Sequence, residues 1–168
     1  MPGAGDADLR MTYCAFVVCA LLDNWSCIDL SRALSYIRRC RVRVSFFLIY
    51  IYLSLLNVCK NFKTYEGGYG QTPHGESLGG PTYCALAALH LVPDDAPRLQ
   101  PSEWRATVRW LLHLQTAPTP ASELGCGFAG RTNKLSDACY GFWCGAALSV
   151  RKPSPPIPHP PTTFTAQI

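Results

Sequence analysis

The sequence is poor in charge. Only 15% of its 168 residues are Asp, Glu, Lys or Arg, whereas 48% are hydrophobic, and the formal net charge is +4. Disordered chains combine high charge with few apolar residues, so we expect a folded protein of one domain. Apart from one group between Arg38 and Arg43, the basic residues are scattered. They form no stripe, which argues against nucleic-acid binding.

The sequence also lacks the marks of a secreted or membrane-spanning protein. The apolar run Met11 to Leu22 follows Asp6 and Asp8 rather than a basic cluster, unlike a signal peptide. The apolar run Val44–Val58 has 15 residues, fewer than the roughly 20 of a spanning helix. The nine cysteines are odd in number and several lie in apolar helical runs, so no disulfide framework is expected. We expect a cytoplasmic protein that does not enter membranes.

Five helices are predicted, and they alternate in character. The segments Asp8–Leu22, Thr82–Leu91 and Ser136–Ser149 are apolar almost all round, which is typical of buried helices. A helix N-capped by Asp29 and the helix Ser102–Gln115 each have one apolar stripe. In the latter we expect a buried face of Trp104, Val108, Leu111, Leu112 and Gln115. An all-apolar helix needs neighbours on every side, so we predict an all-α fold, a partial α/α barrel (toroid) of inner and outer helix pairs.

A repeat organises the chain. Tyr13, Tyr83 and Tyr140 lie near the starts of the apolar helices, 70 and then 57 residues apart. The first interval contains the apolar segment 42–63, whose removal leaves an ordinary helix-pair repeat of 48 residues. We therefore predict a first helix pair in 1–41, an insertion in 42–63, toroid repeats in 64–150 and a disordered Pro-rich tail in 151–168. A retained intron is the favoured origin of the insertion, because pyrimidine-rich DNA encodes Phe, Leu, Ser and Tyr. A natural extension and a membrane anchor stay open.

The most informative motif is GRTNKLSDACYGFW, residues 130–143. Carboxylate and thiolate are both zinc ligands, but side chains two residues apart on a helix diverge by about 200°. Asp137 and Cys139 can therefore share a metal only at the start of a helix. Arg131 and Lys134, three residues apart before that helix, suit a polyanion such as a diphosphate.

Four blocks together resemble the β subunits of the protein prenyltransferases: residues 8–26, 36–40, 65–92 and 125–149. Within that family, YEGGYGQ followed by ES-x-GG is most similar to geranylgeranyltransferase type I. The resemblance implies a cytosolic heterodimer with an α subunit and one Zn²⁺. It also implies transfer of a C20 isoprenoid from geranylgeranyl diphosphate to the cysteine of C-terminal Ca1a2X sequences on small GTPases.

By motif position, the resemblance assigns three overlapping groups of residues. The catalytic group is Asp137, Cys139 and Tyr140, of which the first two correspond to zinc ligands. The diphosphate-binding group is Arg131, Lys134 and Tyr140. The isoprenoid and peptide pocket corresponds to Arg10, Tyr13, Cys84 and Trp143, of which Cys84 and Trp143 also suit a purely structural role in the core.

The sequence departs from the family in three ways. Leu78 stands where the family has a histidine that helps to bind diphosphate. The third zinc ligand, a histidine on a later helix, is absent, and His159 in the tail is a poor substitute, while His74, His90 and His113 suit a loop or helix faces. Five helices are also fewer than the family's barrel contains. We therefore expect an incomplete β subunit with doubtful activity and weak or no zinc binding. The alternatives are a non-catalytic splice or gene-model product that binds the α subunit, and a farnesyltransferase-type β subunit.

Overall fold

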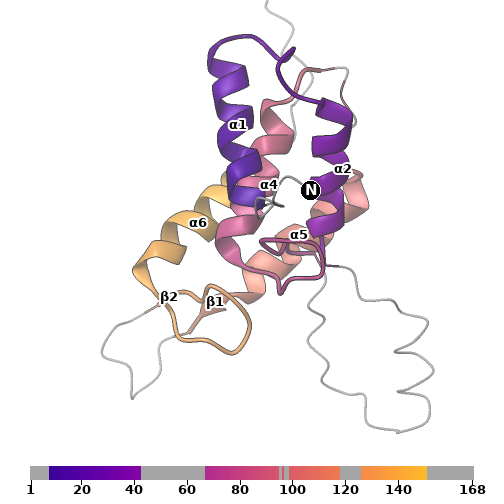
Figure 1. Ribbon diagram of the computed structural model, residues 1–168. Helices are drawn as coiled ribbons and strands as arrows, with labels where there is room; N and C mark the ends of the chain where they lie inside the picture. The colour runs from indigo at the N-terminus through magenta and orange to yellow at the C-terminus, as the bar shows by residue number, and fades with distance from the viewer. Residues whose placement is uncertain (1–7, 43–66, 95, 97–98, 118–125, 151–168) are drawn as a thin grey trace, which may run out of the picture.

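The computed structural model describes residues 8–42, 67–94, 96, 99–117 and 126–150. Most of them belong to five helices (Figure 1): α1 (Leu9–Leu21), α2 (Leu30–Cys40), α4 (Gly79–Leu91), α5 (Pro101–His113) and α6 (Ala138–Ser149). Two short antiparallel strands, β1 (Gln115–Thr116) and β2 (Gly127–Phe128), lie between α5 and α6 in the chain. None of the helices in these ranges is long and apolar enough to cross a bilayer. The predicted tail 151–168, and all of the predicted insertion except Val42, lie outside the described residues.

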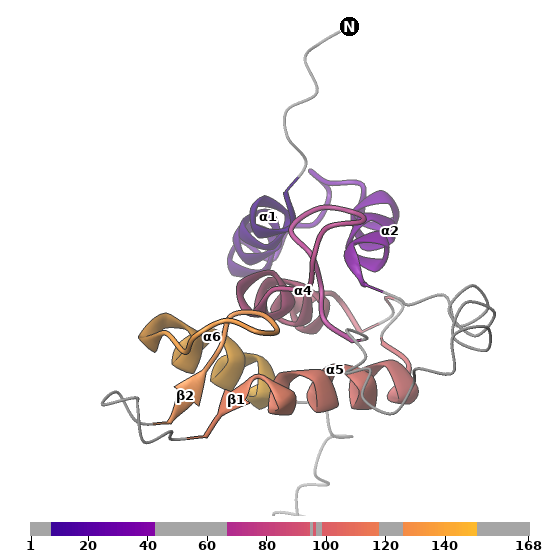
Figure 2. The ribbon, with the colours of Figure 1, turned by 90° about the horizontal axis from the view of Figure 1, so that it is seen from below.

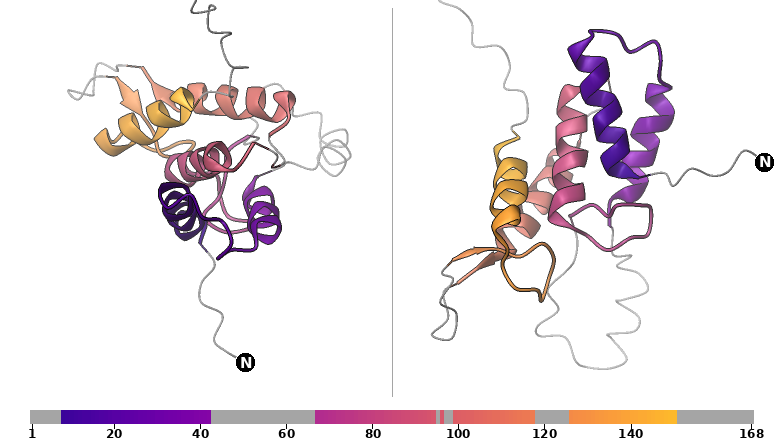
Figure 3. Two further views of the ribbon diagram at one scale, coloured as in Figure 1. Left: turned by 90° about the horizontal axis from the view of Figure 1, so that it is seen from above. Right: turned by 60° about the vertical axis from the view of Figure 1, so that its left-hand side comes forward.

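The helices form an open arc of two layers. Helix α4 lies between α1 and α6, and α2 and α5 cover this inner row on one side (Figures 2 and 3). The middle helix is buried over most of its surface, as its sequence predicts, including Cys84, Ala85, Leu86 and Ala88. Inner and outer helices alternate along the chain, and the predicted partial α/α toroid is confirmed.

Side-chain caps fix the starts of most helices. Asp8, Asp29 and Asp137 have extended backbones, and their carboxylates accept backbone N–H groups of the first turns of α1, α2 and α6. Helix α4 begins at Gly79, three residues before the predicted start. Its N-cap residue Leu78 makes no side-chain cap, and the N–H of Gly79 donates instead to the carbonyl of Gly130 at 2.8 Å.

The loops before α4 and α6 are built alike, which makes the repeat visible in the hydrogen bonds. Beyond the end of α2, Arg41 pairs with Tyr69, and beyond the end of α5, Gln115 pairs with Phe128. The carbonyls of Tyr69 and Phe128 then accept the N–H of the N-cap residues Leu78 and Asp137, at 3.0 and 3.2 Å.

The register of the repeat differs from the predicted one. Asp8, Leu78 and Asp137 are equivalent because each is the N-cap of an inner helix. Counting from these caps, Tyr13 and Tyr83 correspond to Phe142 and not to Tyr140. The shift arises because α6 starts closer to its tyrosine than the other inner helices do.

The residues on either side of the predicted insertion, Val42 and Gly68, lie side by side in the fold. The N–H of Val42 donates to the carbonyl of Gly68 at 3.0 Å. Between these paired residues lie 25 residues, 43–67, whereas the equivalent pair Thr116 and Gly127 encloses 10 residues, 117–126. The first connection is thus longer than its counterpart by the length of the apolar run 44–58.

Three helices differ from the predictions in the faces that they bury. Helix α6 was predicted to be buried all round, but only Cys144 and Ala147 are buried in it. Helix α5 buries Thr107, Trp110 and Leu111, while Leu112 is 52% exposed. The Thr107 hydroxyl donates to the carbonyl of Gly67 at 2.5 Å, which turns that face inward, and the predicted helix residue Gln115 lies in β1 instead.

Helix α1 was predicted to be buried all round but is buried on one side only. Met11, Val18, Leu21 and Leu22 are at least half exposed, because within the described residues α4 is its main neighbour and covers a single face. This end of the arc therefore presents an apolar surface.

Candidate active site

The three inner helices share a cluster of four aromatic side chains, Tyr13, Tyr83, Phe142 and Trp143, which we call the aromatic cluster. Tyr83 of α4 lies at its centre, with its ring centroid 5.7 Å from that of Tyr13, 5.6 Å from Phe142 and 5.5 Å from Trp143. These separations are those of favourable aromatic pairs. Phe142 is 59% exposed, so one side of the cluster is open to solvent.

Arg10 and Cys139 lie one helical turn before the aromatic cluster. Each is three residues before a cluster member, Tyr13 or Phe142, and this spacing places two side chains on one helix face. Both are the second residue of their helix, and in α4 this position is Gly80. Apart from its chain neighbours and the backbone of its own helix, no atom lies within 4 Å of where a Cβ on Gly80 would stand. We call the N-terminal ends of α1, α4 and α6 the rim. It carries the guanidinium group of Arg10, the thiol of Cys139 and, at Gly80, a backbone without a side chain.

Asp137 and Cys139 meet as the sequence predicts, at the start of a helix. The Asp137 backbone is extended, so its side chain folds over the first turn of α6 and accepts the N–H of Cys139 at 2.9 Å. That hydrogen bond lowers the pKa of the Asp137 carboxyl. A hydrogen bond to Asp137 and, to a lesser extent, burial raise the pKa of the Cys139 thiol.

The donor types at this point suit zinc, but their number does not. A catalytic zinc site generally has three protein ligands and one open position. Across the part of the chain that the structure describes, no three His, Cys, Asp or Glu side chains are grouped to hold a metal ion. His74, His90 and His113 are exposed residues of a loop and of two helix ends, and His159 lies outside the described ranges.

The predicted diphosphate-binding residues are only partly brought together. Arg131 forms an ion pair with Glu76, from the loop before α4. Burial raises the pKa of the Tyr140 phenol, and the charge of Arg131 opposes this shift. Lys134 is exposed. The half-buried Leu78 offers no polar group beside them.

Tyr140 is held in place by a glycine. A Cβ on Gly130 would lie 2.0 Å from Cζ of the Tyr140 ring and 2.5 Å from its hydroxyl oxygen. The same ring packs against Gly79 at the start of α4. Glycine at position 130 therefore allows the ring to lie flat against the loop that carries Arg131.

Two residues assigned to the pocket have clear structural partners. Cys84 is 4% exposed, and burial raises the pKa of its thiol to about 11, so it belongs to the packed interior of α4. Arg10 forms a salt bridge with Asp8, whose carboxylate also accepts the side-chain N–H of Gln71 at 2.8 Å.

Three residues of this region were missed by the sequence reasoning: Tyr83, Phe142 and Glu76. Tyr83 was recognised only as a repeat marker, although its equivalence to Tyr13 placed it on the same face. Phe142 was hidden by the shifted register of the repeat. No signal in the sequence pairs Glu76 with Arg131, because 55 residues separate them.

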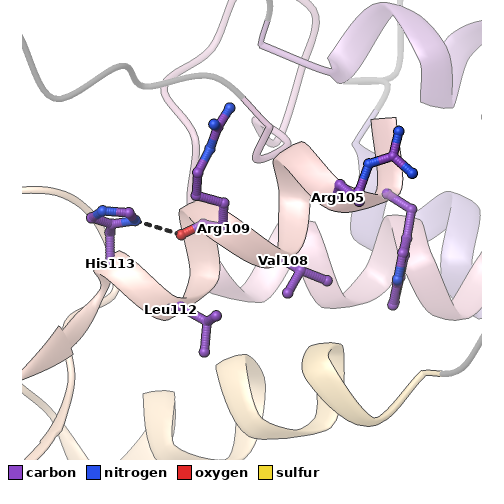
Figure 4. Close-up of a pocket in the computed structure, with 6 residues that line it drawn as sticks. Arg105, Val108, Arg109, Leu112 and His113 are labelled. Atoms are coloured by element: carbon purple, nitrogen blue, oxygen red, sulfur yellow. Dashed lines mark hydrogen bonds between the residues drawn. The ribbon is translucent and has the colours of Figure 1, made fainter. Parts of the chain in front are cut away.

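A hollow of about 370 Å³ lies away from this region, on α5. Figure 4 shows Val108 and Leu112 on one side of the helix, with Arg105, Arg109 and His113 around them. His113 Nδ1 is 2.7 Å from the carbonyl oxygen of Arg109. All of its lining residues come from this single helix, so the hollow is an uncovered helix face.

An arc of paired inner and outer helices, with Asp-Ala-Cys at the start of an inner helix beside an aromatic cluster, defines an α/α toroid protein. The sequence matches the family described as "Prenyltransferase alpha-alpha toroid domain" over residues 1–43 and 51–159. The chain belongs to this family, and the resemblance stated from its motifs is confirmed.

Its relatives include β subunits of two protein prenyltransferases. The chain is 35% identical over 153 residues to the geranylgeranyl transferase type-1 subunit beta of Arabidopsis thaliana, and 37% identical over 149 residues to that of Dictyostelium discoideum. These alignments cover 87% and 89% of this chain but 33% of each relative. The protein farnesyltransferase subunit beta of Arabidopsis thaliana is 34% identical over 147 residues, covering 87% of this chain and 23% of that protein. The chain thus spans about a third of the length of the first two relatives.

Proposed function

We propose that this chain is part of the β subunit of a protein geranylgeranyltransferase type I and forms one wall of its active site. The observation that carries the proposal is the position of Cys139 and Asp137 on the rim, one turn from an aromatic cluster that three inner helices share. An isoprenoid diphosphate has a polar, reactive end and a long apolar chain. Its binding site therefore needs polar, reactive groups beside an extended apolar surface. The type-1 β subunit of Arabidopsis thaliana matches this chain only slightly better than the farnesyltransferase β subunit of the same plant, at 35% over 153 residues against 34% over 147. The choice of type I therefore rests mainly on the YEGGYGQ and ES-x-GG motifs.

In the proposed reaction, the sulfur of a Ca1a2X cysteine bonds to C1 of the C20 isoprenoid. The bond from C1 to the diphosphate oxygen breaks, the diphosphate leaves and the thiol proton passes to solvent. The aromatic cluster would bind the isoprenoid chain. Arg131, aided by Tyr140 and Lys134, would bind the diphosphate after Glu76 is displaced.

The remaining parts of the machinery must come from outside the described residues. We propose that zinc binds to Asp137 and Cys139 together with a third ligand from another segment, and that a cytoplasmic α subunit completes the enzyme. Without the third zinc ligand, the chain as written should not transfer geranylgeranyl to a peptide, either alone or with an α subunit.

A chimera tests the proposal. Residues 8–42 and 67–150 would replace the aligned residues of the Arabidopsis thaliana type-1 β relative, and the relative's own connection would be kept between the two segments. The chimera would be co-expressed with the relative's α subunit. We expect transfer of labelled geranylgeranyl to a Ca1a2X peptide, loss of transfer in Cys139→Ala, and retention in Cys126→Ala, which changes another exposed cysteine. Leu78→His should raise the affinity for the diphosphate substrate.

The same experiment separates the alternatives. Preference for farnesyl over geranylgeranyl diphosphate would assign the chain to the farnesyltransferase type. A folded heterodimer that transfers neither group, even with Leu78→His, would refute the catalytic proposal and leave the non-catalytic product.

A further inference from the structure

Two cysteines meet at the end of the α1–α2 helix pair that lies opposite the rim. Sγ of Cys19, in the last turns of α1, is 3.6 Å from Sγ of Cys27, in the loop that leads to α2. Both are free thiols; Cys19 is 2% exposed and Cys27 is exposed. The proposed prenyl-transfer chemistry uses neither residue.

The loop that carries Cys27 is held firmly over Cys19. The N–H of Asn24 donates to the carbonyl of Cys19 at 3.0 Å, and the Asn24 side chain accepts the N–H of Ser26 at 3.0 Å. The ring of Trp25 packs edge-on against the buried Phe16, with centroids 5.4 Å apart. After Cys27, the N–H of Ile28 donates to the carbonyl of Trp25 at 3.4 Å. The loop is thus held on both sides of Cys27, so the short distance between the sulfurs is built into the fold.

We propose that Cys19 and Cys27 form an oxidant-reactive site that closes reversibly to a disulfide. The sulfurs must approach each other by about 1.5 Å, because a disulfide bond is about 2.05 Å long. Rotation of the exposed Cys27 side chain can supply this movement.

The chemistry needs one equivalent of a hydroperoxide. The Cys27 thiolate attacks a peroxide oxygen, which gives a sulfenic acid at Cys27 and one molecule of water or alcohol. The Cys19 sulfur then attacks the Cys27 sulfur, the disulfide forms and water leaves. The two thiols together lose two electrons, which reduce the peroxide. A dithiol reverses the reaction, which suits a transient disulfide in a reducing compartment.

Exposure selects the order of these steps. Only Cys27 is accessible to an oxidant, whereas Cys19 is enclosed and burial raises the pKa of its thiol. Cys14 is an exposed cysteine on the same helix as Cys19, so it provides an alternative disulfide partner for Cys27 with which the Cys19 pairing can be compared.

Peptide mapping of the whole chain tests this site. The native chain is treated with hydrogen peroxide at low protein concentration, blocked with an alkylating agent and cut before aspartates. Cleavage separates Asp8–Leu22, which carries Cys14 and Cys19, from Asp23–Ile28, which carries Cys27. A bond from Cys27 links these two peptides, and fragmentation of the linked pair by mass spectrometry shows whether Cys14 or Cys19 carries the bond and which of the two is alkylated. We expect this linked pair, two hydrogens lighter than the separate peptides, as the dominant product. Dithiothreitol should release it, and Cys14→Ser should retain it.

The controls make the result decisive in either direction. In urea, Cys27 should pair with Cys14 and Cys19 without preference, and the excess of the Cys19 pair in the native chain measures the contribution of the fold. Cys27→Ser should abolish the linked peptide. An equal mixture of pairings in the native chain, or Cys27 oxidised to a sulfinic acid while Cys19 stays alkylatable, would overturn the proposal.

Discussion

The buried hydroxyl of Thr82 joins the first turn of α4 to the glycine-rich loop before it. Thr82 is 0% exposed; its Oγ1 accepts the N–H of Tyr69 at 2.9 Å and donates to the carbonyl of Leu78 at 2.7 Å. Thr82→Val keeps the shape and removes both bonds. The Leu78 carbonyl still accepts the N–H of residue 82, but the N–H of Tyr69, itself 1% exposed, loses its acceptor.

An unsatisfied buried donor costs about 1–3 kcal/mol. For a chain of this length, this corresponds to a fall in thermal midpoint of roughly 2–12 °C. Thr82→Ser is the matched control; it keeps the hydroxyl and loses one methyl, which costs about 1 kcal/mol. Amide exchange at Tyr69 distinguishes the two causes, because it should accelerate in Thr82→Val and stay slow in Thr82→Ser. A Thr82→Val protein as stable as the wild type, with a protected Tyr69 amide, would refute the reasoning.

Three further results are expected. Deletion of 44–58 should raise soluble yield and leave helicity by circular dichroism unchanged, because it makes the connection between Val42 and Gly68 as long as that between Thr116 and Gly127. Removing 43–63 is a stricter test, since it leaves four residues between Val42 and Gly68. A lower yield for both deletions would contradict the prediction that this segment is an insertion. Zinc should bind the purified chain at less than one per molecule and yield to a chelator, since two ligands are too few; a tightly held equivalent that survives Cys139→Ala would place the metal elsewhere. The hydrogen bond from Arg10 lowers the pKa of Asp8. The stability that the Asp8–Arg10 pair contributes is therefore complete above about pH 4 and is lost as the pH falls below this value. Asp8→Asn should reduce the fall in thermal midpoint at acid pH, and an unchanged fall would show that the pair contributes nothing.

The sequence predicted the helices and their layers well because both follow from local patterns. Asp29 and the alternation of apolar and one-sided helices were enough to give order and class. The rotation of α5 could not be foreseen, since the contacts that accompany it join residues far apart in the sequence, such as Thr107 with Gly67 and Glu103 with Arg41.

The site was predicted in part for a similar reason. The position of Asp137 and Cys139 at the start of a helix is local, so helix geometry was enough to indicate it. The aromatic cluster and the Glu76–Arg131 pair join separate helices and loops, so they depend on the register of the repeat, which the spacing of tyrosines placed two residues out in α6.

The position of α4 between α1 and α6 also bears on how the chain folds as it is synthesised. Helix α1 packs chiefly against α4 and far less against α2, which follows it in the chain. The first helix pair therefore emerges from the ribosome without the surface that buries Leu9 and Phe16. Until residue 91 has been made, α1 lacks its main neighbour, although Phe16 can already pack against Trp25. The long connection after Val42 extends that interval. We therefore expect the α1–α2 pair to gain its final packing only after α4 has been made.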